Sequence, residues 1–88
     1  MAETNPVVED IRAIFLGLAR SLVDASDSVS LEVENDGTAI LFRLSVARSD
    51  VGKVIGQQGR NARALRVLLN AAGVKHKLRL HLDITDYE

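Results

Sequence analysis

Val54-Ile55-Gly56-Gln57-Gln58-Gly59-Arg60 is the stretch that decides the fold of this chain, because it places a Gly-x-x-Gly turn between an apolar segment and a basic one. Glycine has no Cβ atom, so two glycines around two polar residues let the backbone turn tightly and come close to a ligand. Backbone N–H groups in such turns bind phosphate oxygens. The stretch therefore predicts a phosphate clamp, for which a nucleic-acid backbone is the expected ligand.

Charge is distributed unevenly along the chain, although the formal net charge is only −1. Residues 1–42 contain two arginines and eight carboxylates, which gives −6, whereas residues 43–79 contain nine basic residues and a single aspartate, which gives +8. A bipolar molecule with the glycine turn in its positive part can orient an anionic polymer toward that turn. The alternative is a solvated surface with a chance imbalance of charge.

Length and composition set the remaining limits. A chain of 88 residues forms one small domain, and we expect the segments 1–5 and 86–88 to be loose termini. The absence of cysteine excludes disulfides and cysteine-based zinc or redox chemistry. No leader-like segment and no apolar run of about 18 residues is present, so we expect a cytoplasmic protein without membrane contact. No cofactor or metal site is expected.

Hydrophobic periodicity predicts the order helix, strand, strand, helix, helix, strand. The first two strands flank Asp36-Gly37, a strong hairpin signal. Ser49 is the expected N-cap of the short fourth element, and Gly73 is the expected C-terminal stop of the fifth. The predicted elements cover residues 6–23, 29–34, 39–47, 50–55, 60–72 and 76–85.

The apolar faces of these elements are expected to form the core. In the first helix, residues spaced by three and four form one stripe; in the strands, every second residue points inward. The residues assigned to the core are Val7, Ile11, Ile14, Phe15, Leu18 and Leu22 of the first helix, Val29, Leu31 and Val33, then Ile40, Phe42, Leu44 and Val46, then Ala62, Leu65, Leu68, Leu69 and Ala72, and finally Leu78, Leu80, Leu82 and Ile84. Arg63, Arg66 and Asn70 project from the opposite face of their helix.

The turn, now placed between two helices, resembles the signature of the KH domain, and the element order resembles its type II arrangement. The resemblance is carried by residues 50–56, by residues 59–66 and by the alternating last strand. The whole chain is similar to small bacterial proteins with one KH domain, the KhpA or YlqC-like family. The resemblance implies an α+β fold in which three helices pack on one face of a three-stranded mixed sheet.

The same resemblance implies a function. The two helices, the turn and the last strand would form a groove for about four nucleotides of single-stranded RNA, or of single-stranded DNA. Small proteins of this kind are expected to be RNA chaperones or post-transcriptional regulators, which act as a homodimer or as a heterodimer with a second RNA-binding protein. The expected RNA-binding residues are Lys53, Val54, Ile55, Gly56, Gln57, Gln58, Gly59, Arg60, Arg63 and Arg66.

Each expected contact has a distinct role. The N–H groups of residues 56–59 hold phosphate, and Lys53, Arg60 and Arg63 supply ionic attraction. Val54, Ile55 and the strand 78–82 form the floor and rim on which bases lie. Many relatives carry lysine or arginine in the middle of the turn, whereas the glutamines of this chain donate amide hydrogens but bring no charge.

Other functions are disfavoured. The turn lacks the Gly-Lys-Ser/Thr ending of nucleotide-binding loops, and no nucleophile is placed beside a base, so we expect no enzymatic activity. The remaining alternative is a protein-interaction or dimerisation module, in which the Gly-x-x-Gly turn is only structural.

Overall fold

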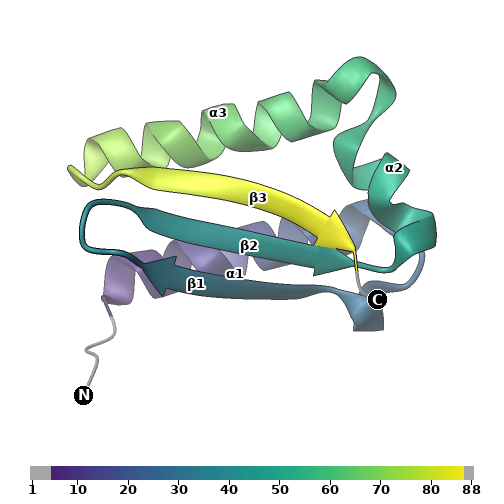
Figure 1. The fold of residues 1–88 in the computed structure, drawn as a ribbon, viewed down its shortest axis with the longest axis horizontal. Coiled ribbons are helices and arrows are strands. Elements are labelled where there is room, and N and C mark those ends of the chain that lie inside the picture. The colour runs from purple at the N-terminus through teal and green to yellow at the C-terminus, as the bar shows by residue number, and fades with distance from the viewer. Residues whose placement is uncertain (1–4, 87–88) are drawn as a thin grey trace.

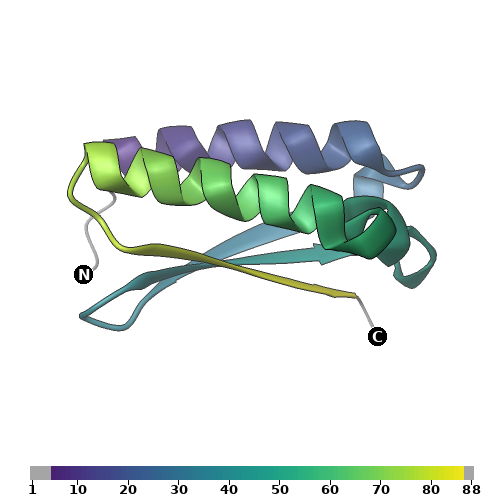
Figure 2. The same cartoon turned by 90° about the horizontal axis from the view of Figure 1, so that it is seen from above.

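Alternating apolar residues build three strands, and two long amphipathic helices cover one face of the resulting sheet (Figure 1, Figure 2). The computed structural model describes residues 5–86. The helices and strands are α1 (Pro6–Leu22), β1 (Ser30–Asn35), β2 (Ile40–Val46), α2 (Val51–Ile55), α3 (Arg60–Lys75) and β3 (Leu80–Asp86). This order and the mixed sheet confirm the predicted α+β fold of the type II KH arrangement.

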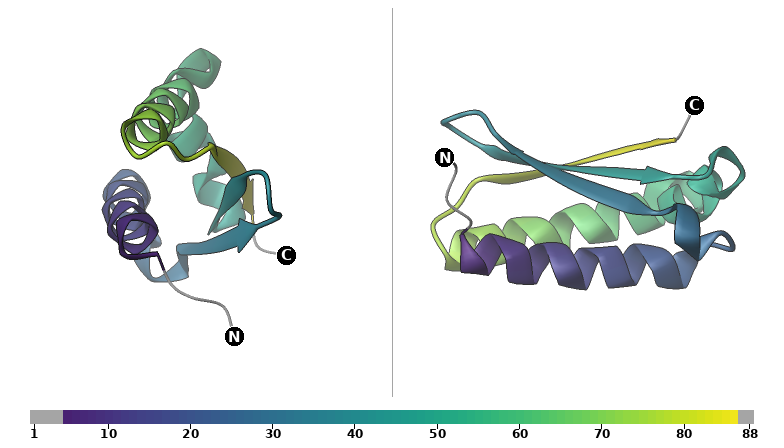
Figure 3. Two further views of the ribbon diagram at one scale, coloured as in Figure 1. Left: turned by 90° about the vertical axis from the view of Figure 1, so that its left-hand side faces the viewer. Right: turned by 90° about the horizontal axis from the view of Figure 1, so that it is seen from below.

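The sheet has the strand order β1-β2-β3, so β2 lies in the centre. β1 pairs with β2 in antiparallel fashion through the hairpin, and β3 pairs with β2 in parallel. Phe42 lies between Val33 of β1 and Leu82 of β3 and is completely buried. α1 and α3 lie side by side over the same face of the sheet, while α2 closes one end of this layer (Figure 1, Figure 3).

The apolar stripe of α1 is rotated from the predicted one. Ile14 is 60% exposed and Leu18 is 37% exposed, whereas Val8 and Ala19 are buried. The line Val8–Ile11–Phe15–Ala19 faces the core, and one flank of the broad apolar surface of α1 is left exposed. In α3, Leu68 is likewise 54% exposed instead of buried.

The predicted stop at Gly73 is wrong, because α3 continues to Lys75. A Cβ on residue 73 would lie 2.6 Å from the carbonyl oxygen of Leu78, so this glycine permits a close approach of backbone rather than a helix end. The N–H of Leu78 donates to Gly73 O at 2.7 Å, which closes the helix. The chain therefore turns through residues 76–79, and β3 begins at Leu80 instead of His76.

Asp50, which the sequence placed in the first turn of a helix capped by Ser49, has a different role. Residues 48–50 form a separate 3₁₀ turn, and α2 begins only at Val51. The Asp50 side chain is buried and accepts hydrogen bonds from the N–H groups of Asp24 at 3.3 Å and Ala25 at 3.0 Å. It fastens the segment after α1 to the start of α2.

The expected loose segments 1–5 and 86–88 lie mainly outside the described residues. Asn5 caps α1 by accepting the N–H of Val7 at 2.9 Å, and Asp86 is the last residue of β3. Within residues 5–86, no helix combines the length and the apolar character needed to cross a bilayer.

The buried Asp50 carboxylate predicts a dependence of stability on pH. The Ala25 N–H, followed by the Asp24 N–H and Lys53, lowers the pKa of Asp50 below its usual value. A lowered pKa stabilises the fold above the ordinary pKa of aspartate, about 3.9, and this stabilisation is lost as the pH falls through the lower folded value. The free energy of unfolding should therefore decrease when the pH is lowered below about 4.

Asp50→Asn should remove that part of the pH profile and lower the unfolding temperature at pH 7 by about 5 °C. Urea unfolding followed by circular dichroism between pH 2 and pH 7 measures both effects. The exposed Asp27→Asn variant is the matched control. Parallel pH profiles for wild type and Asp50→Asn would contradict the anchoring role.

Candidate nucleic-acid interface

The Gly-x-x-Gly turn joins α2 to α3 at one end of the molecule, and its two glycines are required for different reasons. Gly56 has φ 79° and ψ 170°, a backbone conformation that is essentially restricted to glycine. Gly59 has φ 74° and ψ 17°, the left-handed helical conformation, and a Cβ there would meet nothing within 4 Å. Gln58 shares this conformation, with φ 57°.

Asn61, in the first turn of α3, fixes the shape of the turn. Its Nδ2 donates to the carbonyl oxygen of Lys53 at 2.9 Å, which ties α3 to α2 across the turn. A Cβ on residue 56 would lie 2.7 Å from Asn61 Cγ and 2.9 Å from its backbone nitrogen. Gly56 is therefore needed for space as well as for conformation.

The backbone of the turn leaves two N–H groups for a ligand. The N–H of Gly56 donates to Gly52 O, that of Gly59 to Gly56 O, and that of Arg60 to Gln57 O. Within residues 5–86, no acceptor engages the N–H of Gln57 or Gln58, and both residues are exposed. The adjacent N-terminus of the 16-residue α3 adds a favourable field for an anion.

A groove of about 500 Å³ begins at the turn and lies between α3 and the end of β3. Apolar side chains from α2, α3 and β3 and polar side chains from α3 line it. Arg66 reaches across to β3, where its Nε donates to the carbonyl oxygen of Leu82 at 3.4 Å. The lining residues are Ile55, Gly59, Ala62, Arg63, Arg66, Val67, Asn70 and Ile84.

Three basic residues of the segment 43–79, among them the predicted site residue Lys53, are already engaged by carboxylates. Lys53 Nζ lies 3.4 Å from both Asp24 Oδ2 and Asp50 Oδ1, and its hydrogen bond to Asp24 is the main cause that raises its pKa. Arg43 contacts Glu34 at 3.2 Å and Arg48 contacts Asp86 at 3.3 Å. Among the described residues, no carboxylate pairs with the basic side chains of α3 and the following turn, which are Arg60, Arg63, Arg66, Lys75, Lys77 and Arg79.

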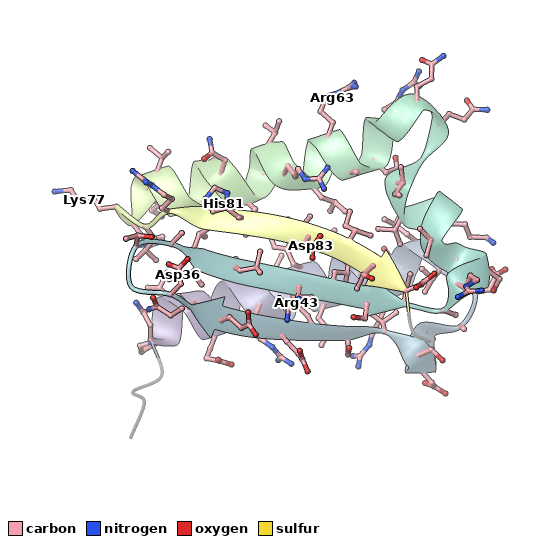
Figure 4. The ribbon with its side chains drawn as sticks, in the orientation of Figure 1. Asp36, Arg43, Arg63, Lys77, His81 and Asp83 are labelled. Carbon is pink, nitrogen blue, oxygen red and sulfur yellow. The ribbon has the colours of Figure 1, made fainter. Side chains whose placement is uncertain are left out.

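Acidic side chains occupy a different surface. Glu32 and Asp83 lie in register on either side of Arg43, on the sheet face that the helices leave open. Figure 4 shows Arg43 and Asp83 on this face, whereas Arg63 projects from α3 and points away from the sheet. The electrostatic field therefore favours an anionic chain along α3 and disfavours one on the open sheet face.

The structure brings most of the predicted site residues together at the glycine turn and the adjoining part of α3, but Val54 and two leucines of the predicted strand are exceptions. Val54 is completely buried, so its side chain belongs to the core and cannot form the groove floor. Leu80 and Leu82 also point into the core, and Ile84 takes the groove position assigned to the strand. Sequence reasoning did not find the role of Asn61, for which the only signal was a short amide side chain at the helix start.

Comparisons with known proteins identify the family. The model described as "KhpA/KhpB, KH domain" matches residues 13–84. The RNA-binding protein KhpA of Halalkalibacterium halodurans is 48% identical over 69 residues, which cover 78% of this chain and 91% of that protein. The RNA-binding protein KhpA of Bacillus subtilis is 39% identical over 83 residues, which cover 94% of this chain and 99% of that protein.

A solved structure shares the fold. The crystal structure of an Era variant from Aquifex aeolicus, bound to GDP and aluminium fluoride, superimposes with a TM-score of 0.60 at 14% sequence identity. The match covers 99% of this chain but only 34% of the Era chain, so this chain spans about a third of that protein. At this identity the likeness shows the fold alone.

The two glycines should respond differently to substitution. Gly59→Ala should destabilise the fold by about 1 kcal/mol, since the site has space and only the left-handed conformation is unfavourable. Gly56→Ala should cost about 3 kcal/mol, because conformational strain adds to the contact with Asn61. Urea unfolding of both variants measures the difference. Equal losses of stability would contradict the close packing of Gly56 against Asn61.

Proposed function

Because the chain belongs to the KhpA/KhpB KH-domain family, we propose that it binds single-stranded RNA through its Gly-x-x-Gly turn and the adjoining groove. The observation that carries this proposal is the pair of unengaged N–H groups at Gln57 and Gln58, placed where the groove begins. Relatives named RNA-binding protein KhpA support RNA as the nucleic acid.

The proposed mechanism divides the work between backbone and side chains. The N–H groups of Gln57 and Gln58 donate to phosphate oxygens, and Arg60 and Arg63 add ionic attraction. Lys53 contributes less than these arginines, because its ammonium group is shared by two carboxylates. The unpaired bases lie in the groove against Ile55 and its apolar neighbours.

The groove suits reversible binding. Neither phenylalanine can stack on a base, because Phe15 and Phe42 are buried in the core. Affinity therefore depends on a few phosphate contacts and on a small apolar surface, which favours rapid release. We place the protein among RNA chaperones or post-transcriptional regulators, which hold RNA without cleaving it.

Protein interaction is a second candidate function, favoured by an apolar surface away from the groove. Ile14, Leu18 and Leu68 are exposed on the outer side of α1 and α3. A hollow of about 180 Å³ between these helices is lined by Leu18, Leu68 and neighbouring residues. Such a surface fits association with a second copy or with a second RNA-binding protein, and it leaves the groove accessible.

The clamp can be tested by reversing its electrostatic character. Gln57→Asp combined with Gln58→Asp should lower RNA affinity at least about tenfold, because two carboxylates would face phosphate. The fold should persist, since both side chains are exposed. Fluorescence anisotropy with a labelled single-stranded RNA measures binding, and circular dichroism checks the fold.

The matched control is Gln57→Asn combined with Gln58→Asn, which shortens both side chains as much as the aspartate variant does but adds no charge. This variant should bind RNA nearly as well as wild type. The clamp is refuted if the aspartate variant retains wild-type affinity.

The dependence on salt separates the two candidate functions. With a few phosphates neutralised, the slope of log affinity against log salt concentration should be about −2 to −4 for single-stranded RNA. Titrations between low and moderate potassium chloride measure this slope. A slope near zero would instead favour the interaction module.

A further inference from the structure

The hollowed surface along α3 continues beyond the groove at the glycine turn. A second hollow of about 230 Å³ continues between α3 and the start of β3. Arg66 and Asn70 line both hollows, so the two adjoin. Arg79 lines the far part of the second hollow, next to the turn that joins α3 to β3.

The two hollows extend over most of α3. Its sixteen residues span about 24 Å at 1.5 Å per residue. Lys77 lies at the end opposite the glycine turn, where Figure 4 shows its side chain projecting from the α3–β3 connection into solvent. A strand held at the glycine turn and laid along α3 therefore leads toward Lys77 and Arg79.

The basic side chains at this far end are available for a ligand. Lys75, Lys77 and Arg79 are exposed, and none has a carboxylate partner within residues 5–86. The nearby hairpin contains Asp36, whose carboxylate accepts the N–H groups of Thr38 and Ala39 at 2.9 and 2.8 Å. These bonds turn the Asp36 charge toward its own loop.

Lys77 also adopts an unfavourable backbone conformation. Its φ of 59° lies in the left-handed region, at the position after a helix where glycine is the usual residue. A residue with a Cβ is strained there, and such strain persists at functional positions. Attraction of cations to the C-terminal end of α3 explains a basic residue nearby, but it does not explain lysine in place of glycine.

We infer that single-stranded RNA continues from the groove along the second hollow to Lys77 and Arg79, which contact further phosphates. This inference rests on the proposed function and extends it: the binding site holds more than the four nucleotides of a KH groove. The strand then follows the full length of α3, and its affinity depends on RNA length.

The test compares randomised-sequence RNAs of four and eight nucleotides by fluorescence anisotropy. Wild type should bind the eightmer more tightly than the tetramer. The slope of log affinity against log salt concentration should be steeper for the eightmer by about 1. Lys77→Gly and Arg79→Ala should each weaken eightmer binding about two- to fivefold and leave tetramer binding unchanged. Arg20→Ala, which removes an exposed positive charge from α1, is the matched control and should change neither.

Lys77→Gly separates binding from folding, because glycine relieves the strained conformation. Its unfolding temperature should rise by about 2 to 6 °C while its eightmer affinity falls. The inference is overturned if Lys77→Gly and Arg79→Ala both bind the eightmer as wild type does, or if wild type gains no affinity with length. Failure of wild type to bind either RNA would refute the proposed function itself.

Discussion

The packing of Gly56 against Asn61 is the constraint on which the candidate site depends. The two residues approach so closely that no side chain fits at position 56, and the Asn61 amide ties the end of α2 to the start of α3. This contact holds α2 against the start of α3. Next to this contact, where the groove begins, the N–H groups of the exposed Gln57 and Gln58 have no acceptor within residues 5–86. Preorganised donors of this kind can bind an anion without the loss of conformational entropy that ordering a flexible loop would cause.

Ion pairing decides which basic residues can serve that site. The sequence alone does not distinguish among the nine basic residues of the segment 43–79, yet carboxylates of other elements engage Arg43, Arg48 and Lys53. The basic residues of α3 and its following turn have no carboxylate partner among the described residues. Positive potential is thus concentrated along one helix, and acidic residues occupy the open face of the sheet. This distribution of charge, rather than the net charge, would orient an anionic chain on the molecule.

Local patterns sufficed for most of the fold. Alternation predicted the strands, and Ile40, Phe42, Leu44 and Val46 are all buried as expected. The Gly-x-x-Gly turn was placed correctly between two helices. The predictions were wrong where an element meets a neighbour. Ile14 and Leu68 were assigned to the core but are exposed, because the apolar stripes of their helices are broader than the surface that the core covers. Gly73 was predicted to end its helix, whereas it permits a close approach of the Leu78 backbone. A pattern within one helix cannot show which flank another helix leaves exposed.

The sequence by itself determined the order of the elements, the position of the glycine turn and the segregation of charge, because these depend on residues close together in the chain. Only the tertiary structure decided that Lys53 pairs with Asp24, that Val54 is buried, and that Arg66 reaches Leu82 to line a groove. Each of these facts depends on contacts between segments far apart in sequence, whose distances are set by packing of the helices on the sheet.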